Sequence, residues 1–217
     1  MNLSFNSSDP TLWKEALASY AARIESLKPE LTPLDTFYTS ALPGLLKARS
    51  PKPHITQPEL SQIMQWKLKR GKWRPRLMKL VESLKDEEVK EASKKAMKAM
   101  PDVGQAVREL SVLKGVGPAT ASAVLAAYAP NVVPFMSDEA MEASIGNSKD
   151  YTLKQYLVFL EKLQEKAKEL TEAGELFTPS DVERALWSAA VGAKQKVSPQ
   201  KSDEVKLATK SKRKRKS

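Results

Sequence analysis

Apolar residues recur at helical spacing along most of the first 190 residues. In the segment 56–70 they recur every three or four residues, which places them on one face of a helix: Leu60, Ile63, Met64 and Leu68. The most strand-like segment is Val132–Met136, but it is short and Pro134 interrupts it, which a central strand resists. The pattern therefore predicts an all-α fold, a multi-helix bundle, with no internal repeat.

Helix-start signals divide this pattern into elements. A capping residue followed by proline stands at Asp9-Pro10, Thr32-Pro33 and Thr178-Pro179, and Thr56 with Glu59 forms a capping box. We expect one helix from Pro10 to about Leu27, and a second that ends near Pro43-Gly44. Further helices are expected at about 57–70, 75–84, 86–99, 102–112, 118–128, 138–145, 152–170 and 179–192.

Three regions follow from these elements. Residues 1–50 form a helical pair whose apolar side chains suggest packing on the main body, across a Pro-rich linker at 50–54. Residues 56–192 form the main helical domain. Residues 193–217 are poor in apolar side chains, so we expect a disordered basic tail.

Charge is concentrated in that tail. The net charge of the 217-residue chain is +10, and residues 194–217 hold ten Lys/Arg and two acidic residues, hence +8 of it. The run near the end resembles a nuclear localisation signal, which implies an import receptor as a partner and the nucleus as the location. Its basic residues are Lys210, Lys212, Arg213, Lys214, Arg215 and Lys216. The alternative is a solubilising tail; either form would add salt-sensitive affinity for phosphates.

Composition narrows the chemistry. The chain has no cysteine, which excludes disulfides, a cysteine nucleophile and thiolate-bound zinc or iron–sulfur clusters, and His54 is the single histidine. We predict no metal and no cofactor. No run of 18 apolar residues and no signal-peptide pattern is present, so we expect an intracellular protein without a membrane partner.

The segment Leu113–Leu125 carries the strongest chemical signal. Its glycines, Gly115 and Gly117, stand one residue apart before Pro118, which suits the first position of a helix. Amide groups at such a helix start point outward and favour an anion. We therefore predict that the main chain here binds a nucleic-acid phosphate, through a segment comprising Lys114, Gly115, Val116, Gly117, Ala119 and Thr120. The alternative is a tight corner between helices without a ligand.

This segment resembles the helix-hairpin-helix motif, apolar-x-Gly-apolar-Gly-x-x-Thr-Ala. The matching residues are Leu113, Gly115, Val116, Gly117, Thr120 and Ala121. The resemblance implies contact with one strand of duplex DNA through backbone amides, without base reading.

A second segment resembles the HhH-GPD superfamily of DNA glycosylases. In that family the hairpin is followed by a loop with proline and then by an aspartate at the next helix start, which here matches Asp138. The resemblance implies that this carboxylate stabilises the oxocarbenium-like charge when the base–sugar bond breaks. The alternative is an ordinary aspartate at a helix N-terminus.

The chain departs from the family in two respects. The position of the Schiff-base lysine of bifunctional members holds Ala119, so no lyase activity is expected by that route. The iron–sulfur cluster of some members is impossible without cysteine. The match is specific only around residues 113–138.

A basic segment, Lys67–Arg76, holds six cations and one tryptophan around a predicted turn. Cations would neutralise phosphates, and Trp73 could stack on a base or insert between base steps. The alternative is a solvated turn with Trp73 in the core. The predicted contacts are Lys69, Arg70, Lys72, Trp73, Arg74 and Arg76.

Three functional hypotheses remain open at this point. The first is a sequence-tolerant, non-catalytic DNA-binding protein linked to repair; the second is a monofunctional glycosylase that uses Asp138. The third is a helical scaffold for protein interactions without nucleic-acid binding.

Overall fold

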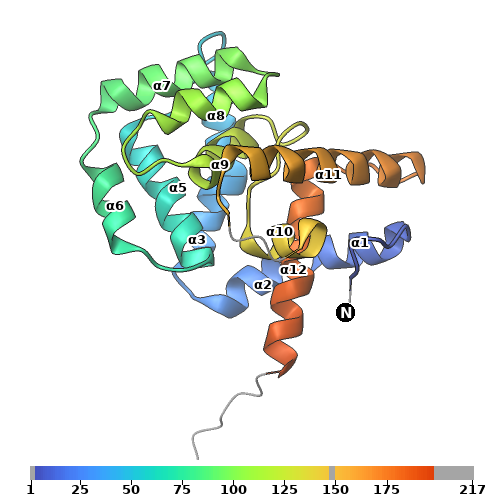
Figure 1. The fold of residues 1–217 in the computed structure, drawn as a ribbon. Helices are drawn as coiled ribbons and strands as arrows, with labels where there is room; N and C mark the ends of the chain where they lie inside the picture. The colour runs from blue at the N-terminus through green and yellow to red at the C-terminus, as the bar shows by residue number, and fades with distance from the viewer. Residues whose placement is uncertain (1–2, 147–149, 198–217) are drawn as a thin grey trace, which may run out of the picture.

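The computed structural model describes residues 3–146 and 150–197, and the regular structure in these ranges is entirely helical (Figure 1). This confirms the predicted all-α class. None of the described helices is both long and apolar enough to cross a membrane.

The N-terminal region differs from the predicted pair of helices. Its elements are α1 (Pro10–Ala18), α2 (Tyr20–Leu27), α3 (Leu31–Thr36), the π-helix η1 (Phe37–Ala41) and α4 (Leu42–Ala48). The prediction of one helix over 10–27 was wrong at Ser19, which ends α1. The predicted stop near Pro43-Gly44 was also wrong. Pro43 lies in the first turn of α4, where a missing N–H is tolerated, and the helix continues past it.

The central helices follow the predicted boundaries closely, and they are α5 (Gln57–Arg70), α6 (Pro75–Glu82), α7 (Asp86–Ala99) and α8 (Val103–Ser111). The capping box is present: the Thr56 amide donates to Glu59 Oε2 at 2.8 Å, and the Glu59 amide donates to Thr56 Oγ1 at 3.4 Å. Gly71 ends α5, with its amide on the Lys67 carbonyl at 3.1 Å.

The last helices are α9 (Pro118–Tyr128), α10 (Asp138–Ile145), α11 (Leu153–Glu172) and α12 (Pro179–Val197). Helix α12 continues beyond residue 193, where we predicted the tail to begin, and Lys194 on it pairs with Glu139 of α10 at 3.2 Å. The predicted import signal at 210–216 lies outside the described residues.

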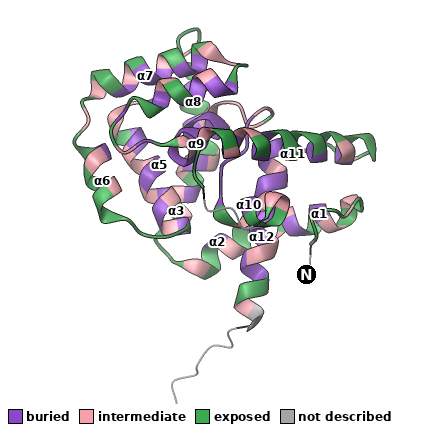
Figure 2. Ribbon diagram, in the orientation of Figure 1, coloured by how far each residue is buried: buried purple, intermediate pink, exposed green. Residues whose placement is uncertain are grey.

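Helix α9 occupies the centre of the bundle (Figures 1 and 2). Every residue from Ala119 to Ala127 is buried, and contacts come from α4, α5, α8 and α11. Small side chains make this possible, because alanine and serine let surrounding helices approach closely on all sides. Because α9 is held at the centre of the bundle, its first turn and the glycine-containing residues 115–117 just before it are also held in place.

The N-terminal helices pack on the main body through polar as well as apolar contacts. Asp35 is buried and accepts two hydrogen bonds, from Tyr20 Oη at 2.6 Å and from Trp66 Nε1 at 2.7 Å. Tyr38 stacks on Trp66, with ring centroids 3.7 Å apart. These contacts join α2, α3 and η1 to α5.

A buried ion pair joins the end of α5 to α12. Arg70 Nη2 lies 2.7 Å from Glu183 Oε1, and both side chains are almost fully buried. Burial raises the pKa of Glu183, while the positive charge of Arg70 opposes the rise. Aromatic rings surround the guanidinium, the nearest being Trp187 with its centroid at 4.2 Å.

Loss of one partner of this pair should destabilise the fold strongly. Glu183→Gln leaves Arg70 buried without a counter-charge, so we expect a loss of about 3–5 kcal/mol in the free energy of unfolding. The exposed pair Lys14–Glu175 supplies the control, since Glu175→Gln should cost about 1 kcal/mol or less. Urea unfolding followed by circular dichroism measures both. Equal losses for the two variants would contradict a structural role for the buried pair.

Candidate nucleic-acid interface

The glycine turn, residues 112–117, joins α8 to α9. Gly115 has φ = +85°, in the left-handed region that favours glycine. A Cβ at this position would lie 2.9 Å from the Leu80 Cβ on α6. Two independent constraints therefore require glycine at 115. Gly117 differs, because its φ of −109° is open to any residue and a Cβ there would meet nothing within 4 Å.

Backbone donors are available at this turn. In the described parts of the chain, the amides of Gly115, Gly117 and Ala119 donate no hydrogen bond that satisfies ordinary geometry, whereas the Val116 amide binds the Leu113 carbonyl at 3.0 Å. Gly117 is exposed to solvent and Gly115 is half-buried. Ala119 is buried, so Gly117 is the exposed residue of the three. Unsatisfied amides beside a helix start are suited to binding an anion.

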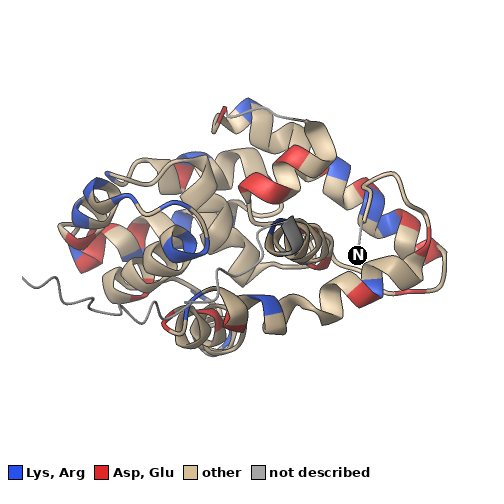
Figure 3. Ribbon diagram, turned by 90° about the horizontal axis from the view of Figure 1, so that it is seen from below, with Lys and Arg blue, Asp and Glu red and all other residues tan. Residues whose placement is uncertain are grey.

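A second group of donors lies on the turn between α5 and α6 and in the first turn of α6. Lys72, Trp73, Arg74 and Arg76 are all exposed, and Trp73 retains 47% of its accessible surface. The alternative of Trp73 as a core residue was therefore wrong. Figure 3 shows Lys and Arg grouped at this turn, whereas acidic and basic residues are interspersed over other helices. An exposed aromatic ring among cations is suited to stacking on a base.

Several predicted contacts occupy other environments. The prediction of Arg70 as a surface cation was wrong, because the last turn of α5 directs its side chain inward to Glu183. Lys69 is half-buried and lies 3.7 Å from Glu30. The side chains of Val116, Ala119 and Thr120 are buried, so Val116 and Ala119 could contact a strand only through backbone atoms.

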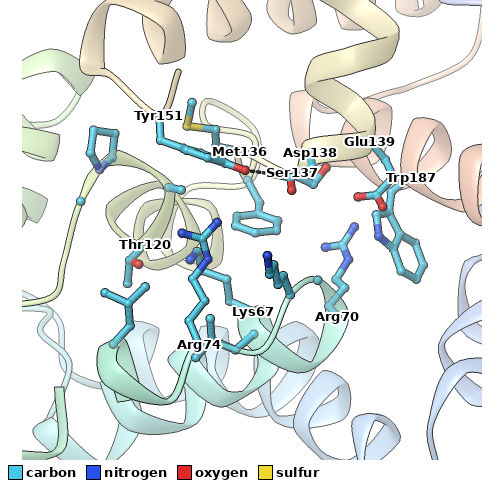
Figure 4. A pocket seen from close by; sticks show the side chains of 18 of the residues that line it. Lys67, Arg70, Arg74, Thr120, Met136, Ser137, Asp138, Glu139, Tyr151 and Trp187 are labelled. Carbon is cyan, nitrogen blue, oxygen red and sulfur yellow. Dashed lines mark hydrogen bonds between the residues drawn. The ribbon is translucent and has the colours of Figure 1, made fainter. Parts of the chain in front are cut away.

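One cavity lies between the three features predicted from the sequence, which are the glycine turn, the basic segment and Asp138. It has a volume of about 240 Å³ and lies between the glycine turn, the α5–α6 turn and the start of α10 (Figure 4). The glycine turn and the start of α9 contribute Gly115, Gly117, Pro118, Ala119 and Thr120 to its lining. From the α5 side come Lys67, Arg70, Lys72 and Arg74, and from the opposite side Asp138 and Tyr151.

Asp138 is exposed at the mouth of this cavity and begins α10. Its Oδ1 accepts a hydrogen bond from Tyr151 Oη at 2.8 Å. The Arg74 guanidinium lies 5.9 Å from the centre of the Tyr151 ring, which links the two walls of the cavity. Partial burial and the Asp138 carboxylate raise the pKa of Tyr151, which further favours the protonated hydroxyl that donates to Asp138.

Apolar side chains line the inner end of the cavity, together with two residues that each carry a buried polar atom without a hydrogen-bond partner. Phe135, Met136 and Trp187 line it beside Arg70. Arg70 Nε and Ser137 Oγ are both buried and have no hydrogen-bond partner within the part of the chain that the structure describes. Buried polar atoms without partners are uncommon in native proteins, and here they lie on residues that line a hollow.

Sequence reasoning missed part of this site. Tyr151 lies just before α11 and Trp187 lies on α12. No local sequence pattern connects either residue to the glycine turn. Lys67 stood in the basic segment but was not singled out; only its position on the inner face of α5 gives it a place in the cavity. No group of three potential metal-ligating side chains occurs in residues 3–146 and 150–197.

Comparison with known proteins does not identify a relative: no protein-family model matches the chain, and neither a curated protein nor a solved structure matches it.

The two glycines should respond differently to substitution. Gly115→Ala forces a Cβ into Leu80 at positive φ, so we expect a loss of about 1–3 kcal/mol in stability. Gly117→Ala adds a methyl group in open space and should change stability by about 0.5 kcal/mol or less. Thermal and urea unfolding measure both variants. A Gly117→Ala variant as unstable as Gly115→Ala would contradict the described turn.

Proposed function

We propose that this protein binds duplex DNA at the glycine turn and the α5–α6 turn, and that it releases a base from a nucleotide turned out into the cavity. The observation that carries this proposal is the meeting of unsatisfied amides, exposed cations and the Asp138 carboxylate around one hollow. We infer a helix-hairpin-helix type of contact, similar to that of the HhH-GPD glycosylases, linked to DNA repair.

Strand binding rests on the amides of Gly115, Gly117 and Ala119. They would hold a phosphate without reading sequence, as main-chain contacts do. Lys72, Arg74 and Arg76 would neutralise neighbouring phosphates, and the exposed Trp73 would stack on a base or insert beside the displaced nucleotide. Because these contacts go to phosphates and to the faces of bases, not to base edges, the contact should tolerate any sequence.

The size of the cavity favours one small planar group. About 240 Å³ lies below the roughly 300–1,000 Å³ of sites for drug-sized ligands. A single nucleobase, with its sugar at the mouth, is a compact ligand of this kind. Chemistry on a base in a duplex requires its extrusion from the stack, and this cavity, which adjoins the exposed α5–α6 turn, would receive it.

Asp138 supplies the chemistry in this proposal. Cleavage of the bond between base and sugar develops positive charge on the sugar, and a fixed carboxylate stabilises that charge. The hydrogen bond from Tyr151 holds the carboxylate in place at the cavity mouth. No nucleophilic side chain is needed for base release, since water completes the reaction.

A nuclear location fits this function. We propose that the basic run at 210–216 directs import, and a fluorescent fusion tests it. Substitution of the run by alanine should move the fusion from the nucleus to the whole cell, while an unchanged distribution would overturn the assignment.

DNA affinity should depend on the open position at 117. Gly117→Leu places a side chain where the phosphate would sit, and we expect roughly tenfold weaker binding, about 1.4 kcal/mol. Arg74→Gln should lower the slope of log affinity against log salt by about one. Fluorescence anisotropy with a labelled duplex at two salt concentrations measures both. Full affinity in Gly117→Leu, with an unchanged melting temperature, would show that the glycine turn does not hold the DNA and would favour a contact through the basic tail; a wild-type protein without duplex affinity would favour a protein-interaction scaffold.

Base release should require Asp138. Duplexes that carry uracil, hypoxanthine, 8-oxoguanine or 3-methyladenine, followed by alkali to cleave abasic sites, test for a product. Asp138→Asn should reduce release by about 100-fold or more while leaving duplex affinity intact, because only the charge is removed. Binding of all four duplexes without any product would favour the non-catalytic DNA-binding function.

A further inference from the structure

The aromatic rings at the inner end of the cavity already hold a cation. The Arg70 guanidinium lies 4.2 Å from the centre of the Trp187 ring and 5.3 Å from that of Phe135, and all three residues line the cavity. A cation within about 6 Å of a ring centroid is attracted by the negative face of the ring. A positively charged ligand that bound to the same rings would therefore have to displace Arg70.

Arg70 is held firmly in this position. Its Nη2 lies 2.7 Å from Glu183 Oε1, and the two side chains retain only 2% and 3% of their accessible surface. Separation of a buried ion pair is costly, because it leaves an uncompensated charge in the core. The Glu183 carboxylate is likewise committed to Arg70, so it offers no counter-charge to a ligand.

Further positive charge lies on the α5 side of the cavity, where Lys67, Lys72 and Arg74 contribute to the lining. None of the three forms an ion pair with any residue that the structure describes. Lys72 and Arg74 are exposed and would meet phosphates in the proposed complex, whereas Lys67 is half-buried. Lys67 is therefore the cation that would face a base inside the cavity.

The acidic side chains of the cavity compensate little of this charge. Glu139 is already paired with Lys194 of α12 at 3.2 Å. Asp138 stands at the mouth with Tyr151, opposite Lys67 in Figure 4, and in the proposed complex it faces the sugar. A base between these walls would therefore lie nearer to positive than to negative charge.

The pKa of Lys67 reflects the same surroundings. Burial lowers this pKa and the positive charge of Arg74 lowers it further, while Asp138 opposes both effects. The causes that disfavour the charge of this amine would also disfavour a positive charge on a ligand beside it.

The hydrogen-bonding groups that face a base from this side are donors. The Arg74 guanidinium and a protonated Lys67 carry no acceptor, and the unsatisfied amide of Gly117 is a donor as well. A base edge with carbonyl oxygens can satisfy such groups, whereas an amino group would meet donors with another donor.

We propose that the cavity takes a neutral base with carbonyl oxygens in place of amino groups, as in uracil and hypoxanthine, and rejects positively charged alkylated bases. This inference rests on the proposed release of a base from the cavity. Hydrolysis of the amino groups of cytosine and adenine gives these two bases, so the substrate class is that of deaminated bases. Both are mispaired opposite the original partner, which lowers the cost of extrusion relative to correctly paired thymine and guanine.

Two bases of the same shape test the effect of charge. One duplex carries 7-methylguanine and the other its neutral analogue 7-methyl-7-deazaguanine, each opposite a stable abasic analogue so that neither base is paired. A 2′-fluoro sugar prevents base release in both, so affinity is compared without a difference in bond cleavage. Fluorescence anisotropy of the full-length protein at mildly acidic pH, where 7-methylguanine keeps its charge, should show roughly tenfold tighter binding of the neutral base.

Uracil and cytosine test the carbonyl group in the same duplex and on the same sugar. At neutral pH uracil should bind roughly fivefold tighter, because cytosine presents its amino group to the donors of the α5 side. An equal affinity for the two bases, or a preference for cytosine, would overturn the assignment to deaminated bases.

Lys67→Gln should reduce the preference for the neutral purine, because it removes the cation that faces the base. Lys79→Gln is the matched control, since it removes an exposed cation of α6 that does not line the cavity. A loss of preference as large in Lys79→Gln would indicate a general effect of surface charge and would contradict the role of the cavity. Melting temperatures show whether both variants fold, and if Lys67→Gln does not, the comparison of the two purines on the unaltered protein still decides.

Failure of this inference can be distinguished from failure of the proposed function. Equal or tighter binding of 7-methylguanine by the unaltered protein would overturn the inference and leave the proposed base release standing. An absence of binding to every duplex would overturn the proposed DNA contact, and the inference with it.

Discussion

The buried contact between Arg70 and Glu183 determines the shape of the candidate site. Arg70 is the last residue of α5, immediately before the exposed basic turn, and Glu183 lies on α12. The rings of Trp66, Phe135 and Trp187 surround the Arg70 guanidinium. Gly71 ends α5 one residue later, and the ion pair anchors the last turn of the helix to α12, so it holds the inner end of the cavity and the point from which the basic turn leaves the core.

The site itself combines rigid walls with exposed donors. Helix α9 is buried at the centre of the bundle, and Gly115 is confined by Leu80, so the amides of the glycine turn are held by the core. Asp138 is held by Tyr151, which in turn lies against Arg74. Groups positioned by packed helices lose little entropy when a ligand arrives, which favours binding and catalysis.

Local patterns in the sequence predicted the helices well, because capping residues and apolar spacing act within one element. The capping box at Thr56 and the start of α10 at Asp138 are examples. The π-helix η1, whose Tyr38 stacks on Trp66, was not predicted. The continuation past Pro43 was not predicted either, because it depends on α4 following η1 directly, so that Pro43 falls in a first turn. The inward direction of Arg70 and the hydrogen bond of Tyr151 depend on partners 113 and 13 residues away, which no local pattern reveals.

The central claim is that main-chain amides of the glycine turn hold a DNA phosphate. A titration of the ¹⁵N-labelled protein with an abasic duplex, followed by amide chemical shifts, tests it most directly. The account predicts that the largest shifts occur at Gly115, Gly117 and Ala119. Shifts confined to the basic residues after 197, with the glycine turn unchanged, would contradict it.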